Sequence, residues 1–134
     1  MAYEIPNFQL GVLAADIDMS NADTYQYTPV RARATSGVGV SGAAALAPVA
    51  VEGDQIVGVL QNNPQLAEAG TVMVEGVTKA KAAGTIAVGD KLMAATAGGF
   101  KVGTTGLYGV ATALEPAVLG DTFSILLQNH GVLP

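Results

Sequence analysis

Short runs of β-forming residues, separated by turns that contain glycine, recur along most of this chain, which has 134 residues and 17 glycines. The turns fall about every eight to twelve residues, a spacing typical of a small β-sandwich or barrel rather than of alternating strands and helices. Gly98 and Gly99, for example, are a hairpin signal between two such runs. The pattern predicts an all-β fold, a small β-barrel or β-tulip-like domain with short helical turns.

The individual elements are expected to be short. One helical turn is predicted over residues 43–46, which Pro48 ends, and another over residues 63–70, where Asn63 is a cap and Pro64 takes the first helical position. Strands are predicted over residues 24–33, 49–51, 56–60, 72–74, 77–83, 91–95, 100–102, 108–113 and 123–127.

The first 23 residues have a different pattern. Tyr3, Ile5 and Phe8 are large and apolar, but Pro6 interrupts them and they show no helical period. We therefore expect an extended N-terminal arm over residues 1–23 and a β-rich domain over residues 24–134. Such an arm is stable only where it packs, either on its own barrel or along the sheet edge of a neighbour. Tyr3, Ile5, Pro6 and Phe8 are therefore candidate partner-binding residues.

The chain carries little charge for a soluble domain. Charged residues make up 13% of it, against about 25% in typical domains, and 50% of the residues are hydrophobic. One interpretation is a surface covered by small uncharged residues. The other is a surface largely buried in an oligomer or a larger assembly, because the cores of interfaces are poor in charge. The net charge of −5 argues against direct contact with nucleic acid, which needs clustered basic residues.

No membrane or targeting segment is predicted. The longest uncharged stretch, residues 34–51, is interrupted by serines, glycines and Pro48, whereas a spanning helix needs about 20 strongly apolar residues. The first residues have neither the basic nor the apolar region of a signal peptide. We expect a soluble protein that is made in a cytoplasm.

Residues of the kinds used in catalysis and metal binding are scarce. Cysteine is absent, which excludes disulfides and thiolate sites, and His130 is the single histidine; we expect it at the surface or in an interface. Asp16 and Asp18 imitate the start of a calcium loop. Asn21 and Tyr27 stand where that loop requires glycine and a bidentate glutamate, so a solvated acidic turn is expected. The chain is predicted to hold no cofactor or metal and to be no enzyme.

A glycine-rich segment matches the spacing of a dinucleotide-binding loop, through Gly37, Gly39 and Gly42. That motif requires a long helix directly after it, and Pro48 leaves room for about one helical turn. We therefore attribute the match to glycine-rich low complexity.

Two pairs of basic residues each share one face of a predicted strand: Arg31 with Arg33, and Lys79 with Lys81. We expect them at solvated edge positions, where charge discourages sheet-to-sheet aggregation. The alternative is that they pair with acidic loops on a partner.

The order of turn glycines and strand residues between residues 58 and 127 forms a longer pattern. It runs through Gly58, Val59 and Gln61, then residues 69–76 (AG-x-V-x-V-x-G), residues 83–92 (AG-x-I-x-x-GD-x-L), Gly98, Gly99, residues 108–115, Gly120 and Asp121. This pattern resembles that of the small head decoration, or capsid cement, proteins of tailed bacteriophages. The resemblance covers a little over half of the chain.

The resemblance implies a function. Members of that family are β-rich and usually trimeric, and they bind the outer surface of an icosahedral capsid, where they stabilise the shell against the pressure of packaged DNA. The implied partners are the major capsid protein and other copies of this chain, and the implied location is the exterior of the virion. The alternative is a phage-particle module that recognises a carbohydrate or a host surface. That function favours exposed aromatic residues, and the aromatic content is 5% with no tryptophan.

Overall fold

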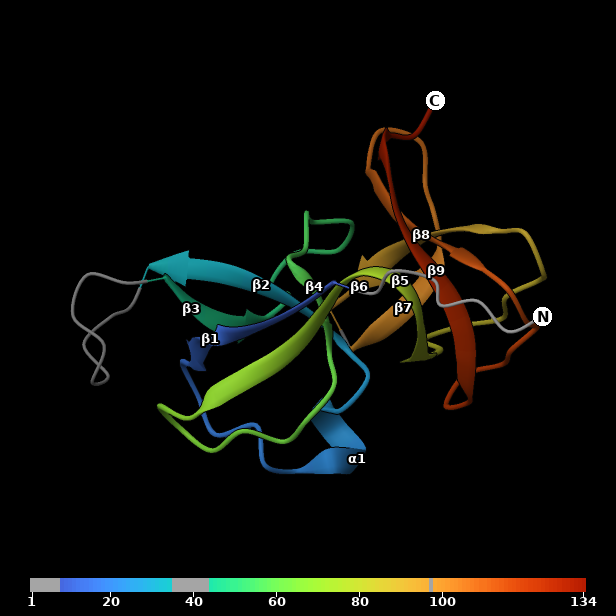
Figure 1. Cartoon of the computed structure of the whole chain (residues 1–134). Helices are drawn as coiled ribbons and strands as arrows, with labels where there is room; N and C mark the ends of the chain where they lie inside the picture. Colours follow the sequence, from blue (N-terminus) through green and yellow to red (C-terminus); the bar gives the residue numbers. More distant parts are fainter. Residues whose placement is uncertain (1–7, 35–43, 97) are drawn as a thin grey trace, which may run out of the picture.

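The computed structural model describes residues 8–34, 44–96 and 98–134. Two β-units share one long strand, β5 (Figure 1). In chain order the elements are β1 (Phe8–Ala15), α1 (Ala22–Tyr25), β2 (Pro29–Ala34), β3 (Ala44–Pro48), β4 (Gly58–Leu60), β5 (Ala69–Lys81), β6 (Lys91–Ala95), β7 (Gly99–Val102), β8 (Tyr108–Ala113) and β9 (Thr122–Val132). The predicted all-β fold class is confirmed.

The first unit, called the first barrel below, is closed. Its strands follow the order β1, β3, β2, β4 and the first half of β5, and it closes because β1 also pairs with β5. Met19, Leu46, Leu60 and Val72 fill its interior and are fully buried. Strand β1 falls within the expected N-terminal arm, so this part of residues 1–23 pairs with the sheet of its own chain.

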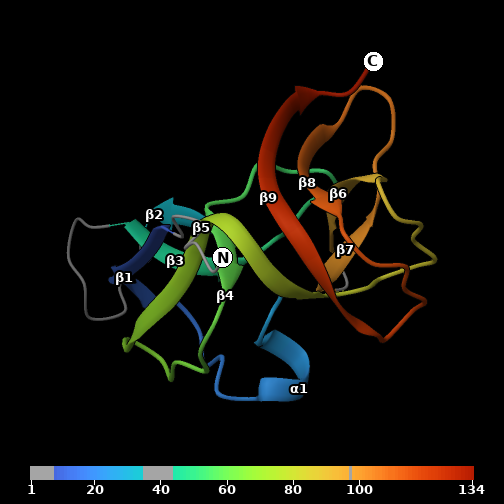
Figure 2. The same ribbon diagram turned by 45° about the vertical axis from the view of Figure 1, so that its right-hand side comes forward.

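The second unit, called the second sheet below, joins the last half of β5 to β9, β8, β6 and β7. Ala82, directly after β5, forms a parallel bridge with Phe100 in β7, which brings the two ends of the sheet together. Phe100, Leu92 and Ile125 are fully buried in its core. Figure 2 shows β5 passing from the first barrel into the second sheet.

The passage of β5 between the units depends on Gly76. Up to Glu75 the strand pairs with β1, and from Gly76 onward it pairs with β9, starting opposite Leu127. Gly76 has a φ of +112°, a conformation that L-residues with a side chain rarely adopt. Two separate strands were expected over residues 72–74 and 77–83, and the structure joins them into one strand bent at a glycine.

Several local predictions are wrong for tertiary reasons. Residues 44–48 form strand β3 rather than a helical turn, because they pair with residues 30–34 of β2 and bury Leu46. Residues 63–70 contain no helix, and Ala67 has a φ of +66°. The short helix lies instead at α1, where the side chain of Asn21 accepts a hydrogen bond from the N–H of Asp23. Residues 49–51 form no strand.

Within the described ranges, no helix has the length and the apolar character that crossing a membrane requires.

Candidate functional site

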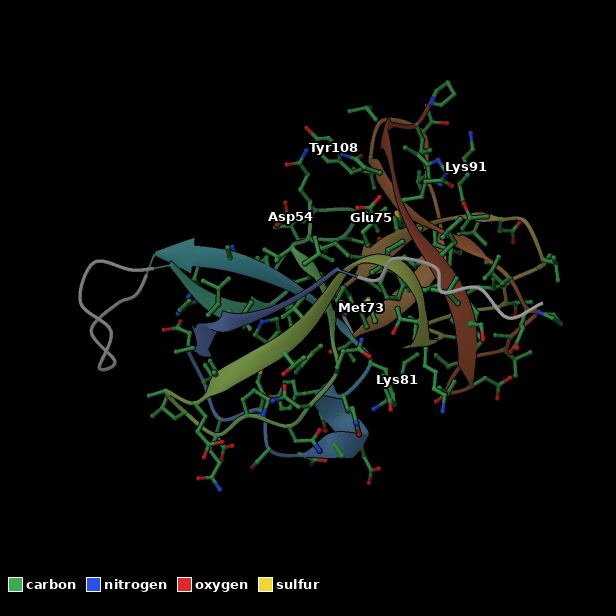
Figure 3. The ribbon with its side chains drawn as sticks, in the orientation of Figure 1. Asp54, Met73, Glu75, Lys81, Lys91 and Tyr108 are labelled. Carbon is green, nitrogen blue, oxygen red and sulfur yellow. The ribbon has the colours of Figure 1, made fainter. Side chains whose placement is uncertain are left out.

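A groove opens where the first barrel and the second sheet meet, at the bend of β5. Its cavity has a volume of about 610 Å³. The lining comes from the residues before and in β4, from β5, from β8 and from β9, and Figure 3 shows the labelled Glu75 near the bend. The lining residues are Ile56, Val57, Gly58, Val74, Glu75, Gly76, Val110, Leu126, Leu127, Gln128 and Asn129.

A bulge in β9 shapes one wall of this groove. Gly109 pairs with Gly131 and Ala111 pairs with Leu127, so one residue of β8 lies opposite three residues of β9. The Oδ1 atom of Asn129 accepts a hydrogen bond from the N–H of Gly131 at 2.8 Å, which closes the bulge. Bulges often occur next to binding sites because they change the direction of side chains.

The walls of the groove are largely apolar. Six of its lining residues are isoleucine, valine or leucine, and the one ionisable residue among them is Glu75, which is exposed. A single carboxylate beside two amide side chains does not form a paired general acid and base. Apolar walls of this kind accommodate apolar side chains of a ligand or of a peptide segment.

Residues 86–90 and 117–121 form two turns of the same design, called the turn pair below. The Oδ2 atom of Asp90 accepts a hydrogen bond from the N–H three residues before it at 2.8 Å, and Asp121 does the same at 3.1 Å. The glycine before each aspartate has a positive φ, +86° and +91° respectively. An antiparallel bridge between Ile86 and the other turn holds the two turns side by side.

The turn pair exposes large apolar side chains. Val88 is 63% exposed, Val118 56% and Leu119 74%, and Leu114, just before the second turn, is 42% exposed. Exposed apolar side chains that gather on adjacent turns mark interaction surfaces in monomeric proteins. The turn pair is therefore a second candidate binding surface.

His130 is half-buried in the second sheet. Its Nε2 atom lies 2.9 Å from Oγ1 of Thr112, and that hydroxyl also lies 3.3 Å from Oε1 of Gln128. A catalytic triad requires a nucleophile on one side of the imidazole and a carboxylate on the other. The partner of this imidazole is the hydroxyl of Thr112, which is neither a serine nor a carboxylate.

The acidic turn over residues 16–21 is only partly solvated. Asp16 is 5% exposed and forms an ion pair with Arg33, so the prediction of a solvated turn is wrong at this residue. Asp18 is exposed, and hydrogen bonds from the hydroxyl and the N–H of Ser20 hold its pKa below the ordinary value. Among the described residues, no group of three or more histidine or carboxylate side chains is placed to hold a metal ion.

The arginine pair on β2 is engaged within the chain. Arg33 binds the buried carboxylate of Asp16, and Nε of Arg31 donates a hydrogen bond to the carbonyl oxygen of Pro48 at 3.2 Å. Both side chains therefore hold the first barrel together. The expectation of fully solvated positions is therefore wrong for this pair, while the side chain of Arg33 is still 37% exposed.

The two lysines on β5 have different surroundings. Lys79 is exposed, as expected for a solvated position. Nζ of Lys81 instead donates hydrogen bonds to the carbonyl oxygen of Ala22, at 2.9 Å, and to that of Asp23. Lys81 thereby ties α1 to the end of β5.

Stability is expected to depend on the protonation of Lys81 at high pH. Partial burial lowers the pKa of Lys81 below its ordinary value, although Asp23 opposes the shift. As the pH rises, the folded chain therefore loses this proton first, and the unfolded chain keeps it up to about pH 10.5. The free energy of unfolding should then rise with pH in the interval just below pH 10.5. Urea denaturation of the Lys81→Met variant at several pH values should not show this rise, whereas the Lys79→Met variant should still show it. A rise that the Lys81→Met variant retains would contradict the assignment.

Some residues singled out in the sequence lie outside the described part of the chain: Tyr3, Ile5, Pro6, Gly37, Gly39 and Gly42. Phe8, the fourth candidate partner-binding residue, begins β1, and its backbone lies opposite Glu75. Because Glu75 lines the groove, one end of the described part of the arm lies at the edge of the groove.

Sequence reasoning does not locate the groove. The groove forms between residues 56–58 and residues 126–129, which are far apart in the chain. The available signal is Gly76, a glycine between two predicted strands, which indicates a bend. The turn pair has a clearer signal, because a Gly-Asp step follows an apolar residue at both places.

Comparisons with known proteins establish the fold and leave the family open. No protein-family model matches the sequence, and no curated protein matches it. Among solved structures, the chain is similar to the N base of the head fiber protein gp8.5 of bacteriophage phi29, with a TM-score of 0.67 and 14% sequence identity. The match covers 96% of this chain and 98% of that chain. This likeness shows that the two chains share a fold over almost their entire lengths.

Proposed function

We propose that this chain is a structural protein of a bacteriophage particle, which attaches to the outside of the icosahedral head as a homotrimer and stabilises the shell against the pressure of packaged DNA. The main support is the fold that it shares, over 96% of its length, with the base of a phage head fiber. The proposed role is non-enzymatic and uses no cofactor. The proposed partners are the major capsid protein and other copies of this chain, after synthesis in the host cytoplasm.

The surface of the chain is consistent with attachment to other proteins. Charged residues are 13% of the chain, and the turn pair presents apolar side chains that water solvates poorly. The net charge of −5 suits the exterior of a particle better than contact with its DNA. These features support an attached protein and do not by themselves identify its partner.

The proposed mechanism of attachment is avidity. A protomer that binds one capsid subunit weakly gains affinity when two further copies are linked to it, because the later contacts are intramolecular. Three linked contacts raise the apparent affinity by about 10²–10⁴ without new chemistry. A cyclic trimer also matches a threefold position on an icosahedral shell.

Association with the head is the direct test of the proposed function. Purified full chain, mixed with heads of the encoding phage that lack this protein, should sediment with them in a saturable manner and raise their melting temperature. Light scattering should give the mass of a trimer, either free or when released from the heads. Failure to bind heads, together with specific binding on a glycan array, would instead favour the carbohydrate-recognition function.

The arm is proposed to contribute to attachment through Tyr3, Ile5, Pro6 and Phe8. Deleting residues 1–7 leaves β1 intact, because that strand begins at Phe8. We expect the deletion to weaken binding to heads by about tenfold or more, equivalent to about 1.4 kcal/mol. Quantitative co-sedimentation measures the loss, and the circular dichroism spectrum checks that the fold is retained. Binding that is equally tight without these residues rules out a contribution from the segment 1–7.

A further inference from the structure

We propose that the groove at the bend of β5 binds an extended peptide segment of a partner protein, which adds to the edge of β9 as a further strand. The segment carries apolar side chains at alternate positions and one lysine or arginine, which pairs with Glu75. The proposal goes beyond the role in the virion and does not depend on it. It assigns a class of ligand to an apolar cavity of about 610 Å³.

The groove lies where β5 and β9 separate from each other. Their antiparallel pairing covers residues 76–81 of β5 and residues 122–127 of β9. Continued in the same register, it would bring residues 74–75 opposite residues 128–129. The bend at Gly76 instead directs β5 into the first barrel, and these four residues line the groove. The groove is therefore a fork between two strands.

Residues 128–130 of β9 are in strand conformation, but within the described part of the chain no residue of β5 or β8 lies directly opposite them. On one side the pairing with β5 stops at Leu127, and on the other side β8 pairs with Leu127 and then with Gly131. Consecutive residues of a strand direct their backbone N–H and C=O groups to opposite edges. One of Gln128 and Asn129 therefore directs these groups to the side that β5 has left. A strand edge of this kind can pair with an extended peptide.

The walls of the groove define the side chains that such a peptide needs. Six wall residues are isoleucine, valine or leucine. A cube of the volume of the groove has an edge of about 8.5 Å, the length of two or three extended residues at about 3.3 Å each. Because alternate side chains of a strand share a face, a stretch of three residues presents two of them to the walls. Valine or isoleucine at both places matches the apolar walls and favours the strand conformation.

The charge of the groove specifies the remaining feature of the peptide. Glu75 is exposed and is the one ionisable residue of the lining, and the ion pairs formed among the described residues do not include it. Asp54, two residues before the wall residue Ile56, is also acidic. A lysine or arginine in the peptide complements this charge, whereas an acidic peptide is repelled.

Selection from a peptide library tests the proposal on the full chain. An mRNA-displayed library of random nonapeptides is selected on the immobilised native chain and on two variants. Glu75→Lys reverses the charge in the groove, and Lys79→Glu reverses an exposed charge on the same strand outside the groove lining. The Tm of both variants should match that of the native chain, because both side chains are exposed.

The native chain and the Lys79→Glu variant should enrich peptides that have a lysine or arginine among alternating valine or isoleucine residues. The Glu75→Lys variant should enrich peptides with aspartate or glutamate in that place. It should also bind the peptide selected on the native chain at least about fivefold more weakly, the effect of one exposed ion pair. The absence of an enriched sequence, or the same charge preference in all three chains, overturns the proposal.

N-methylation of the enriched peptide separates strand addition from binding by side chains alone. A methyl group on a backbone nitrogen removes one hydrogen-bond donor and leaves every side chain unchanged. If the peptide pairs with β9, methylation at alternate positions should weaken binding at least about tenfold, and methylation at the positions between them should have little effect. Isothermal titration calorimetry measures these affinities. A peptide that tolerates methylation at every position overturns the proposal.

Light scattering during the peptide titration identifies a second copy as the occupant. Peptide binding to a groove that serves a different partner should leave the mass of the protein assembly unchanged, apart from the peptide itself. A peptide that binds only by separating copies of this chain shows that the groove is an interface between them, and it overturns the proposal.

Discussion

Replacing Gly58 with alanine is expected to lower the free energy of unfolding by about 3 kcal/mol or more, at the upper end of the cost of overpacking. A Cβ atom at this position would lie 2.0 Å from the carbonyl oxygen of Met73 and 2.7 Å from Cγ1 of Val72. The backbone of β4 cannot move away easily, because Val59 and Leu60 are fully buried in the two cores. The first barrel would have to open between β4 and β5 to admit one methyl group.

Gly84→Ala is the matched control for this substitution. The nearest atom to a Cβ at Gly84 is 3.8 Å away, and its φ is not in the positive range, so its stability should stay within about 0.5 kcal/mol of the native chain. Thermal unfolding measures both variants, and a loss of 3 kcal/mol corresponds to a fall in Tm of about 10 °C for a chain of this size. Equal stability of the two variants would contradict the close approach of β4 to β5.

Arg33→Met is expected to cause a loss of similar size, about 3 kcal/mol, for an electrostatic reason. The side chain of Asp16 is 1% exposed, and Arg33 is the residue that forms an ion pair with it. Removing the guanidinium leaves a buried carboxylate without its cation, and the loss of one partner of a buried pair costs about 3–5 kcal/mol. The side chain of Arg33 is itself 37% exposed, so the lower end of that range applies.

Two further variants separate the ion pair from general packing. Arg31→Met removes a neighbouring arginine from the same face of β2 and one hydrogen bond to a carbonyl oxygen, so it should cost about 1 kcal/mol. Adding Asp16→Asn to Arg33→Met should recover part of the stability, because no unpaired charge then remains buried. Urea denaturation gives the three free energies. An Arg33→Met loss no larger than that of Arg31→Met would show that the ion pair adds little.

The two candidate surfaces differ in how they would serve an attached protein. The groove is concave, and its bend residue Gly76 belongs to the strand that joins both units, so an occupant contacts both units at once. The turn pair exposes the apolar side chains of Val88 and Leu119 on turns that have internal hydrogen bonds. Exposed apolar side chains of this kind can be buried in a pocket on a partner.

Much of the second sheet could be predicted from the sequence. The Gly98 and Gly99 hairpin, the runs at residues 91–95 and 108–113, and the start of β9 all appear as expected, because neighbouring strands there are joined by short turns with clear residue signals. The first barrel was harder to predict. Strand β3 contains three alanines in five residues, a composition that favours helix, and becomes a strand through its pairing with β2.

The candidate site, too, could be predicted from the sequence only in part. The sequence predicts an apolar arm, because this depends on a few adjacent residues. It does not predict the ion pair of Asp16 with Arg33 or the groove, because their parts are brought together only when the barrel closes.

The sequence by itself determined the all-β class, the positions of the tight turns and the low charge of the surface, since each is a property of local residue pattern or composition. The tertiary structure alone decided that one strand serves two units, that Asp16 is buried, and that a groove lies at the bend of β5. The physical reason is that pairing between distant strands, and not local preference, sets which residues are shielded from water.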